Sequence, residues 1–392
     1  MLRVAVVTGT RAEYGLLSPL MRILQNDDAF KLHVIATGAH LSQRFGMTVN
    51  AILEDGFSVD TRIPLPLEDD SASGIIRAMA AAQTGLAEAI ERLEPDVVVL
   101  LGDRYEMLAA ATAAFVSGVA IAHIHGGETT EGAVDDGFRH AITKLSQLHF
   151  VAAEPYRRRV IQMGEAPDRV FNVGALGLDV IEQADLVGRE TLMADLGWPP
   201  DARFLLMTFH PVTLDADAGI NELQNVLAAL DTFTDYRVLI TGHNADRGHR
   251  GIGGLLSDYA AARPGRVVLR ASLGQANYVS AMKYTEAVVG NSSSGIIEAP
   301  TMRVPTVNIG DRQKGRLRSP SVIDSRGDMA SVTEGLTRAL SPSFREAATR
   351  AVSPYGTPGG SRRIADVLRN VSIGALTHKR FYDLPMIGQL AT

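Results

Sequence analysis

The chain has 392 residues, of which 46% are hydrophobic and 21% charged, as is typical of a globular protein rather than a disordered one. Its formal net charge of −6 does not indicate a nucleic-acid-binding surface, which carries clustered positive charge. The absence of cysteine excludes disulfides, thiolate catalysis and cysteine–zinc sites. A chain of this length exceeds one ordinary hydrophobic core, so we expect two domains.

The N-terminal residues lack the long apolar run and cleavage site of a signal peptide. The charge-free run 107–122 falls short of the ~20 apolar residues needed to cross a bilayer. We therefore expect a cytoplasmic protein that binds neither membranes nor nucleic acid.

Short apolar runs alternate with helical patterns in the first half of the chain. Because the runs are too short and too continuously apolar for amphipathic helices, we interpret them as buried strands. The predicted strands are residues 2–7, 32–36, 97–101, 119–124 and 150–152, with helical patterns at 16–25 and 74–93. Strands alternating with helices predict a parallel sheet covered by helices.

The same pattern begins again in the second half. Strands are predicted at residues 204–208, 238–241, 267–269, 287–289 and 306–309, and helices at 222–232, 277–284, 296–299 and 361–370. We therefore predict an α/β protein with two doubly wound, Rossmann-like domains, 1–185 and 186–392. If the strand ends of the two domains face each other, they form one deep cleft, because ligands bind beyond the carboxyl ends of parallel strands.

A dense group of titratable side chains follows the predicted strand 119–124. Such a group at the end of a buried strand favours acid–base chemistry over a polar surface loop. Its members are His123, His125, Glu128, Glu131, Asp135, Asp136, Arg139 and His140.

Asp103 follows the predicted strand 97–101 and is a second acid–base candidate, with the alternative of an ion pair to Arg104. A metal site is not expected, because His123 and His125 would point to opposite faces of a strand and no His-Glu-x-x-His pattern occurs. No GxGxxG or Walker A motif occurs either, so we expect no cofactor.

The segment 290–295 places three serines between a predicted strand and a predicted helix. Hydroxyls and backbone N–H groups at a helix start bind phosphate, although helix capping alone is the simpler interpretation. The candidate phosphate-binding residues are Ser292, Ser293, Ser294 and Gly295. Glu298, one turn into the helix, suits a ribose hydroxyl better than a phosphate.

Further polar residues at strand ends are candidates for binding a nucleotide. Arg11 and Arg312 could hold phosphate, and His210 could contact a diphosphate. Arg104 and Asn244 also follow predicted strands. The alternative for Arg11 is a solvated surface arginine.

These motifs together resemble the UDP-N-acetylglucosamine 2-epimerase family, and in particular its hydrolysing branch, which serves sialic-acid-type sugar synthesis. The similarity covers nearly the whole chain and rests on residues 9–17, 101–106, 123–128, 139–145, 209–213, 290–295 and 308–316. It implies a GT-B fold, with two facing domains, a cleft between them and a C-terminal helix that crosses back. It also implies a homodimer or homotetramer.

The resemblance assigns roles to individual residues. Ser292, Ser293 and His210 match diphosphate contacts, Glu298 matches the ribose-binding carboxylate, and Arg11 and Arg312 match positions around the nucleotide. Asp103 and the acidic pair Asp135 and Asp136 match acid–base groups. Relatives often carry Glu where this chain has His125, so proton transfer falls either to His125 or to Glu128.

The implied reaction converts UDP-N-acetylglucosamine and water to N-acetylmannosamine and UDP. Because the hydrogen on carbon 2 is barely acidic, we expect anti elimination of UDP to a 2-acetamidoglycal, followed by hydration. An alternative substrate is UDP-N,N'-diacetylbacillosamine, on a route to legionaminic acid. Two other interpretations are a GT-B glycosyltransferase and a nucleotide-sugar sensor without catalysis.

Overall fold

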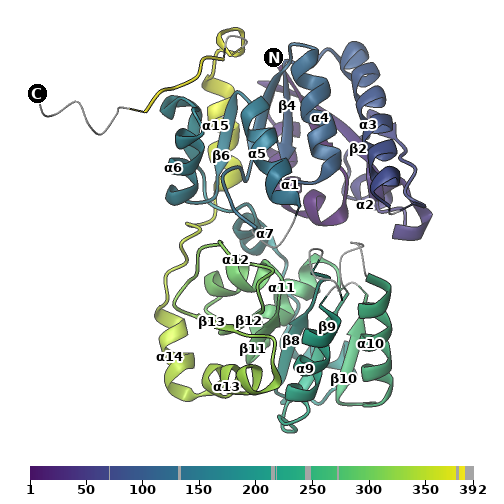
Figure 1. Cartoon of the computed structure of the whole chain (residues 1–392), viewed down its shortest axis with the longest axis vertical. Coiled ribbons are helices and arrows are strands. Elements are labelled where there is room, and N and C mark those ends of the chain that lie inside the picture. Colours follow the sequence, from purple (N-terminus) through teal and green to yellow (C-terminus); the bar gives the residue numbers. More distant parts are fainter. Residues whose placement is uncertain are drawn as a thin grey trace, which may run out of the picture. The chain divides into compact units, whose positions relative to one another are not determined.

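The computed structural model describes residues 1–69, 71–130, 134–212, 217, 219–242, 249–271, 273–376 and 379–384. The chain forms two compact units, whose helices and strands are labelled in Figure 1. The first unit consists of Met1–Glu128, Asp135–Asp179 and Pro358–Thr392, and the second of Thr129–Val134 and Val180–Thr357. Both units are therefore discontinuous in sequence.

The first unit contains a seven-stranded sheet in the order β3-β2-β1-β4-β5-β6-β7, in which every strand pair is parallel. The sequence pattern does not predict β3 or β7, because each has only three residues. The strands are β1 (Leu2–Thr8), β2 (Phe30–Thr37), β3 (Thr61–Ile63), β4 (Val97–Leu101), β5 (Ala120–Ile124), β6 (Leu148–Val151) and β7 (Val170–Asn172).

Helices cover this sheet. They are α1 (Arg11–Gln25), α2 (Val49–Glu54), α3 (Ala72–Leu93), α4 (Tyr105–Val116), α5 (Asp135–Leu145), α6 (Glu154–Gln162) and α15 (Gly360–Asn370), with 3₁₀ turns η1 (Gly38–Leu41), η2 (Gln43–Phe45), η3 (Pro167–Arg169) and η4 (Ile373–Ala375). Helix α7 (Gly177–Gln183) contains the boundary between the units. Helix α1 begins at Arg11 rather than at Leu16, because Thr10 and Glu13 form a capping box.

Both faces of the first sheet are buried. Along β1, Val4 and Val6 belong to one hydrophobic cluster, whereas Ala5 and Val7 belong to another. This alternation follows from the period of two in a strand, and it explains why the strands of a covered parallel sheet are apolar throughout.

Helix α15 returns the C-terminal part of the chain to the first unit. Figure 1 shows this helix in yellow among the teal and purple elements. Its Ile364, Ala365 and Leu368 are buried in the same cluster as residues of α1. The carboxylate of Asp179 accepts hydrogen bonds from the N–H groups of Gly360 and Ser361, at 3.0 and 2.6 Å. A carboxylate at a helix N-terminus satisfies otherwise unpaired donors and complements the helix dipole.

The second unit contains a six-stranded parallel sheet in the order β10-β9-β8-β11-β12-β13. Its strands are β8 (Phe204–Thr208), β9 (Arg237–Thr241), β10 (Val267–Arg270), β11 (Ala287–Gly290), β12 (Thr306–Ile309) and β13 (Val322–Ser325). Its helices are α8 (Arg189–Asp195), α9 (Ile220–Leu230), α10 (His249–Ala261), α11 (Gln275–Tyr284), α12 (Ser294–Thr301), α13 (Met329–Leu340) and α14 (Pro342–Arg350).

The prediction of two parallel sheets with covering helices is confirmed. Strand β13 was not predicted, because its polar sequence does not form an apolar run. Among the residues that the structure describes, every helix is too short or too polar to cross a lipid bilayer.

A buried carboxylate holds the end of α5 in the first unit. Glu165 lies 2.6 Å from the amine of Lys144, 2.9 Å from Nε2 of His149 and 2.8 Å from the amine of Lys379. Lys379 also donates to the carbonyl oxygens of Lys144 and Ser146, both at 2.6 Å. The C-terminal segment therefore caps α5 through a lysine, at the helix end where a positive charge is favourable.

We predict that Glu165 makes the first unit sensitive to acid. Burial alone would raise the pKa of Glu165, but His149, Lys144 and Lys379 lower it to about 2. Because the pKa in the unfolded chain is near 4.5, the stabilisation is complete above that value and is lost as the pH falls towards 2. Glu165→Gln should lower the free energy of unfolding by about 3 kcal/mol at pH 6. The difference in this free energy between variant and wild type should shrink towards pH 3.

Urea unfolding of wild type and variant between pH 3 and 7 measures this effect. Glu154→Gln is the matched control, since Glu154 is a half-exposed carboxylate on α6 whose ion pairs contribute little. The prediction is contradicted if the free energies of unfolding of wild type and Glu165→Gln differ by the same amount at every pH.

Candidate functional site

The carboxyl ends of β4 and β5 bring the predicted acid–base residues of the first unit together. These strands are neighbours in the sheet, and Leu101 pairs with Ile124 at their ends. Asp103 follows β4, whereas His125 and Glu128 follow β5. Because parallel strands end at one edge, residues that are distant in sequence meet there.

Arg139 links these residues. Its guanidinium forms an ion pair with Asp103 through Nη2. Its Nη1 donates to the backbone carbonyl of His125 at 2.9 Å and lies 3.8 Å from Oε2 of Glu128. The side chain of Arg139 is only 3% exposed and that of Glu128 only 1%, so the contacts lie in a dry environment where electrostatic interactions are strong.

Both ring nitrogens of His125 have a defined neighbour. Nε2 accepts a hydrogen bond from the backbone N–H of Leu176 at 3.3 Å, and Nδ1 lies 3.1 Å from Oε1 of Glu128. The backbone of His125 has a φ of +65°, a conformation that is uncommon for a residue other than glycine. The structure thus brings His125, predicted to transfer protons, against the other candidate, Glu128.

His123 lies in β5 and is fully buried. Its Nε2 donates to the carbonyl oxygen of Gly102 at 2.8 Å, and its Nδ1 lies 3.1 Å from the hydroxyl of Thr143. Burial lowers the pKa of His123 to about 3, so its ring is neutral at physiological pH. This histidine therefore supports the strand end rather than adding a charge to it.

The acidic pair Asp135 and Asp136 forms the first turn of α5, where negative charge is favoured by the helix dipole. Asp136 lies 3.5 Å from Nε2 of His140, one turn further along. Burial lowers the pKa of His140, whereas Asp136 opposes this shift. Glu131 lies outside the described residues.

A second carboxylate pair lies beside the first cluster. Arg104 binds Glu106 through Nε and Nη2, both at 3.2 Å, and its Nε lies 4.0 Å from Glu13. Glu13 accepts hydrogen bonds from the N–H groups of Gly9 and Thr10, at 2.8 and 3.1 Å. The predicted substrate-binding residue Arg104 is therefore held by buried carboxylates.

Sequence reasoning did not select Glu13, although the Thr-x-x-Glu spacing after a strand signals a capping box there. Burial raises the pKa of Glu13 to about 7; Glu106 adds to this shift, and Arg104 opposes it. Glu13 thus titrates near physiological pH at the same edge of the sheet. Arg11, at the first residue of α1, is exposed.

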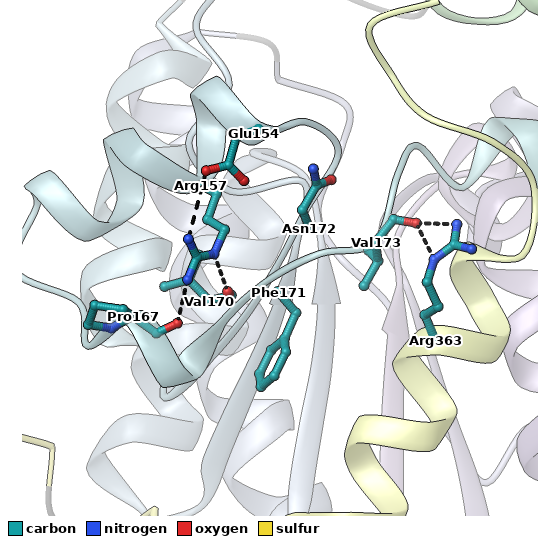
Figure 2. A pocket seen from close by; sticks show the side chains of 8 residues that line it. All are labelled: Glu154, Arg157, Pro167, Val170, Phe171, Asn172, Val173 and Arg363. Atoms are coloured by element: carbon teal, nitrogen blue, oxygen red, sulfur yellow. Dashed lines mark hydrogen bonds and ion pairs between the residues drawn. The ribbon is translucent and has the colours of Figure 1, made fainter.

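The first unit also has a shallow hollow between α6, β7 and α15, apart from the predicted residues (Figure 2). Two arginines line it, but both bind backbone carbonyl groups. Arg157 donates to Val170 and Pro167, each at 2.9 Å, and Arg363 donates to Val173 at 3.0 and 2.7 Å. We therefore assign no ligand to this hollow.

In the second unit, the serine segment leads from β11 into α12. Ser293 is the N-cap residue of α12, but its side chain makes no capping hydrogen bond, whereas the hydroxyl of Ser292 accepts from the backbone N–H of Ser294 at 3.4 Å. The hydroxyls of Ser292 and Ser294 lie 3.1 Å apart, and that of Ser294 lies 2.6 Å from the hydroxyl of Tyr278. Burial raises the pKa of Tyr278 to about 12, which keeps this phenol protonated.

Asn291 joins this segment to His210. Its side chain accepts from the backbone N–H of His210 at 2.7 Å and donates to the carbonyl of His210 at 2.8 Å. Arg312 donates to the carbonyl oxygens of Pro211 and Asn291, at 3.3 and 3.2 Å. Asn291, which precedes Ser292, thus contacts both His210 and Arg312 at the ends of β8, β11 and β12.

Two further predicted residues belong to α12. A Cβ on Gly295 would approach Cγ2 of Thr306 to 2.9 Å, so glycine there allows close packing of α12 against the sheet. Glu298 lies one turn into α12 and is partly buried. Asn244 lies outside the described residues. Among the described residues, no group of three or more His, Asp or Glu side chains could hold a metal ion.

The two parallel-sheet units define a GT-B-like α/β protein. A crystal structure of UDP-GlcNAc 2-epimerase from Neisseria meningitidis bound to UDP-GlcNAc matches with a TM-score of 0.81. The match covers 94% of this chain and 99% of that one, at 19% sequence identity. This likeness supports the fold.

The chain belongs to the UDP-N-acetylglucosamine 2-epimerase family, whose family model matches residues 22–369. It is 38% identical to the GDP/UDP-N,N'-diacetylbacillosamine 2-epimerase (hydrolyzing) of Campylobacter jejuni, over 97% of this chain and 99% of the relative. It is 36% identical to the UDP-N,N'-diacetylbacillosamine 2-epimerase (hydrolyzing) of Legionella pneumophila, over 95% and 96%. The family resemblance seen in the sequence is confirmed.

We predict that Glu13 destabilises the folded protein as the pH rises. Its pKa rises from near 4.5 in the unfolded chain to about 7 in the folded protein, so folding favours the protonated carboxyl. The contribution of Glu13 to the free energy of unfolding is therefore greatest below about pH 4.5 and is lost as the pH rises through 7. The free energy of unfolding of Glu13→Gln should rise above that of the wild type between pH 5 and 8, by up to about 3 kcal/mol.

The measurement is urea unfolding at several pH values, compared with Glu91→Gln, which removes an exposed carboxyl on α3. If the free energy of unfolding changes with pH in the same way for Glu13→Gln and wild type, Glu13 does not titrate in this range.

We also predict that Asn291 is required to hold His210. Asn291→Ala leaves a buried N–H and a buried carbonyl of His210 without their partner, at a cost of about 1–3 kcal/mol each. The variant should unfold at a lower temperature than the wild type, as measured by calorimetry. Asn221→Ala, an exposed change on α9, is the control, and a melting temperature of Asn291→Ala equal to that of the wild type refutes the prediction.

Proposed function

We propose that this protein is a hydrolysing 2-epimerase that converts UDP-N,N'-diacetylbacillosamine and water to UDP and the free sugar inverted at carbon 2. The observation that carries the proposal is the match, over nearly the full chain, to two relatives named for this reaction. These relatives favour this substrate over UDP-N-acetylglucosamine, which we expected first. UDP-N-acetylglucosamine remains the second candidate.

The proposed reaction proceeds by elimination and addition. In the first step the bond from carbon 1 to the UDP oxygen breaks, carbon 2 loses its proton, and a 2-acetamidoglycal forms. In the second step water adds its oxygen to carbon 1, and carbon 2 receives a proton on the opposite face. The protein must stabilise the departing diphosphate and supply groups that remove and return protons.

In this proposal, the first unit supplies the proton-transfer groups. Asp103 and Glu128 are held around one guanidinium, and Asp135 and Asp136 begin the helix that carries Arg139. A buried cation fixes the carboxylate positions, which general acid–base catalysis requires.

The second unit supplies the diphosphate site in this proposal. The start of α12 offers hydroxyls and backbone N–H groups, and the ends of β8 and β12 add His210 and Arg312. Donors fixed before the reaction are well suited to a leaving diphosphate, because they need little reorganisation as its charge develops. Glu298 is assigned to the ribose.

Turnover in deuterated water tests this function. We predict UDP release from both nucleotide sugars, with a higher kcat/KM for UDP-N,N'-diacetylbacillosamine, and deuterium at carbon 2 of the free sugar. Protium retained at carbon 2 rules out elimination and addition. A higher kcat/KM for UDP-N-acetylglucosamine overturns the substrate assignment but leaves the reaction type intact.

Asp103→Asn serves as the control for chemistry. It should lower kcat by about 10²–10⁴-fold while UDP still binds. A glycosyltransferase would instead transfer the sugar to an acceptor without exchange at carbon 2. A sensor would bind the nucleotide without turnover in the wild type.

A further inference from the structure

We infer that His125 is a positioning residue, which holds the carboxylate of Glu128 in place and does not itself exchange a proton with carbon 2. The inference rests on the proposed function, because it concerns the proton-transfer step of that reaction. It separates two candidates that the sequence left open.

The hydrogen-bond chemistry of the ring determines its tautomer. The backbone N–H of Leu176 can only donate, and it points at Nε2 of His125 from 3.3 Å. Nε2 must therefore present its lone pair, and the single proton of a neutral imidazole lies on Nδ1. Nδ1 lies 3.1 Å from Oε1 of Glu128, the distance of an ion pair.

Neither nitrogen of His125 is then available as a base. The lone pair on Nε2 is directed at Leu176, and the protonated Nδ1 lies beside a carboxylate. The ring is only 9% exposed, so rotation towards a substrate would break both contacts inside a packed region. Glu128 is the proton-accepting group of the pair.

The backbone of His125 positions a second group. At φ +65° its carbonyl oxygen accepts from Arg139 at 2.9 Å, and the guanidinium of Arg139 pairs with Asp103. One residue therefore orients Glu128 through its ring and Arg139 through its main chain. The position requires a side chain with a donor near Cγ and a backbone that tolerates positive φ, two properties that asparagine also has.

The tautomer can be observed without any substrate. Nitrogen-15 NMR of the histidine-labelled protein at pH 7.5 should show a neutral ring protonated at Nδ1 whose signal is missing from His125→Asn, whereas a signal from His33, whose Nδ1 lies 3.0 Å from Asp60, should remain. A His125 ring that is protonated at Nε2, or at both nitrogens, overturns the inference.

Kinetics of matched variants test the role itself. Asparagine places an amide N–H where Nδ1–H stands, so His125→Asn should lower kcat by no more than about tenfold, the cost of the lost Leu176 contact. Glu128→Gln should lower kcat by about 10²–10⁴-fold with UDP binding retained. His125→Ala removes the hydrogen-bond donor, and alanine adopts positive φ less readily than asparagine. His125→Ala should therefore lower kcat more than His125→Asn does.

If His125→Asn is as inactive as Glu128→Gln while its melting temperature and UDP affinity match wild type, His125 is the proton-transfer group and the inference fails. The pH profile of kcat gives a second readout, because His125→Asn should keep the wild-type profile. Absence of carbon-2 exchange in the wild type would defeat the proposed function, whereas the NMR result would still report the geometry of His125.

Discussion

The acid–base edge of the first unit depends on one buried guanidinium. Arg139 contacts Asp103, the main chain of His125 and Glu128, which come from two different strand ends. A single cation between two carboxylates offsets a repulsion that would otherwise separate them. Its planar, forked geometry also fixes directions, which a lysine amine could not do.

Sheet topology explains why such a group forms here. Neighbouring parallel strands deliver their following residues to one edge, so Asp103 and Glu128 meet although 24 residues separate them in sequence. The second unit repeats this arrangement with a different chemistry, since its strand ends carry hydroxyls and cations. The same architecture thus presents carboxylates in one unit and anion-binding donors in the other.

Sequence patterns predicted the central strands well, because a buried parallel strand is a largely apolar run, as β4 and the first four residues of β8 are. They failed at β3, β7 and β13, which are short or polar and depend on neighbours for pairing. The motifs located the candidate residues, but not the contacts between them. That Leu176 would approach His125 depends on tertiary structure and leaves no signal in the local sequence.

The discontinuity of the first unit has a consequence for the order of events during protein synthesis. The ribosome makes α1 and most of the sheet first, but Ile364 and Leu368 of α15, which complete the hydrophobic core, emerge only after the second unit. The lysine that caps α5 emerges later still. The first unit to be translated therefore cannot complete its packing until the second has been made, and its apolar surface near α1 stays open to chaperones meanwhile.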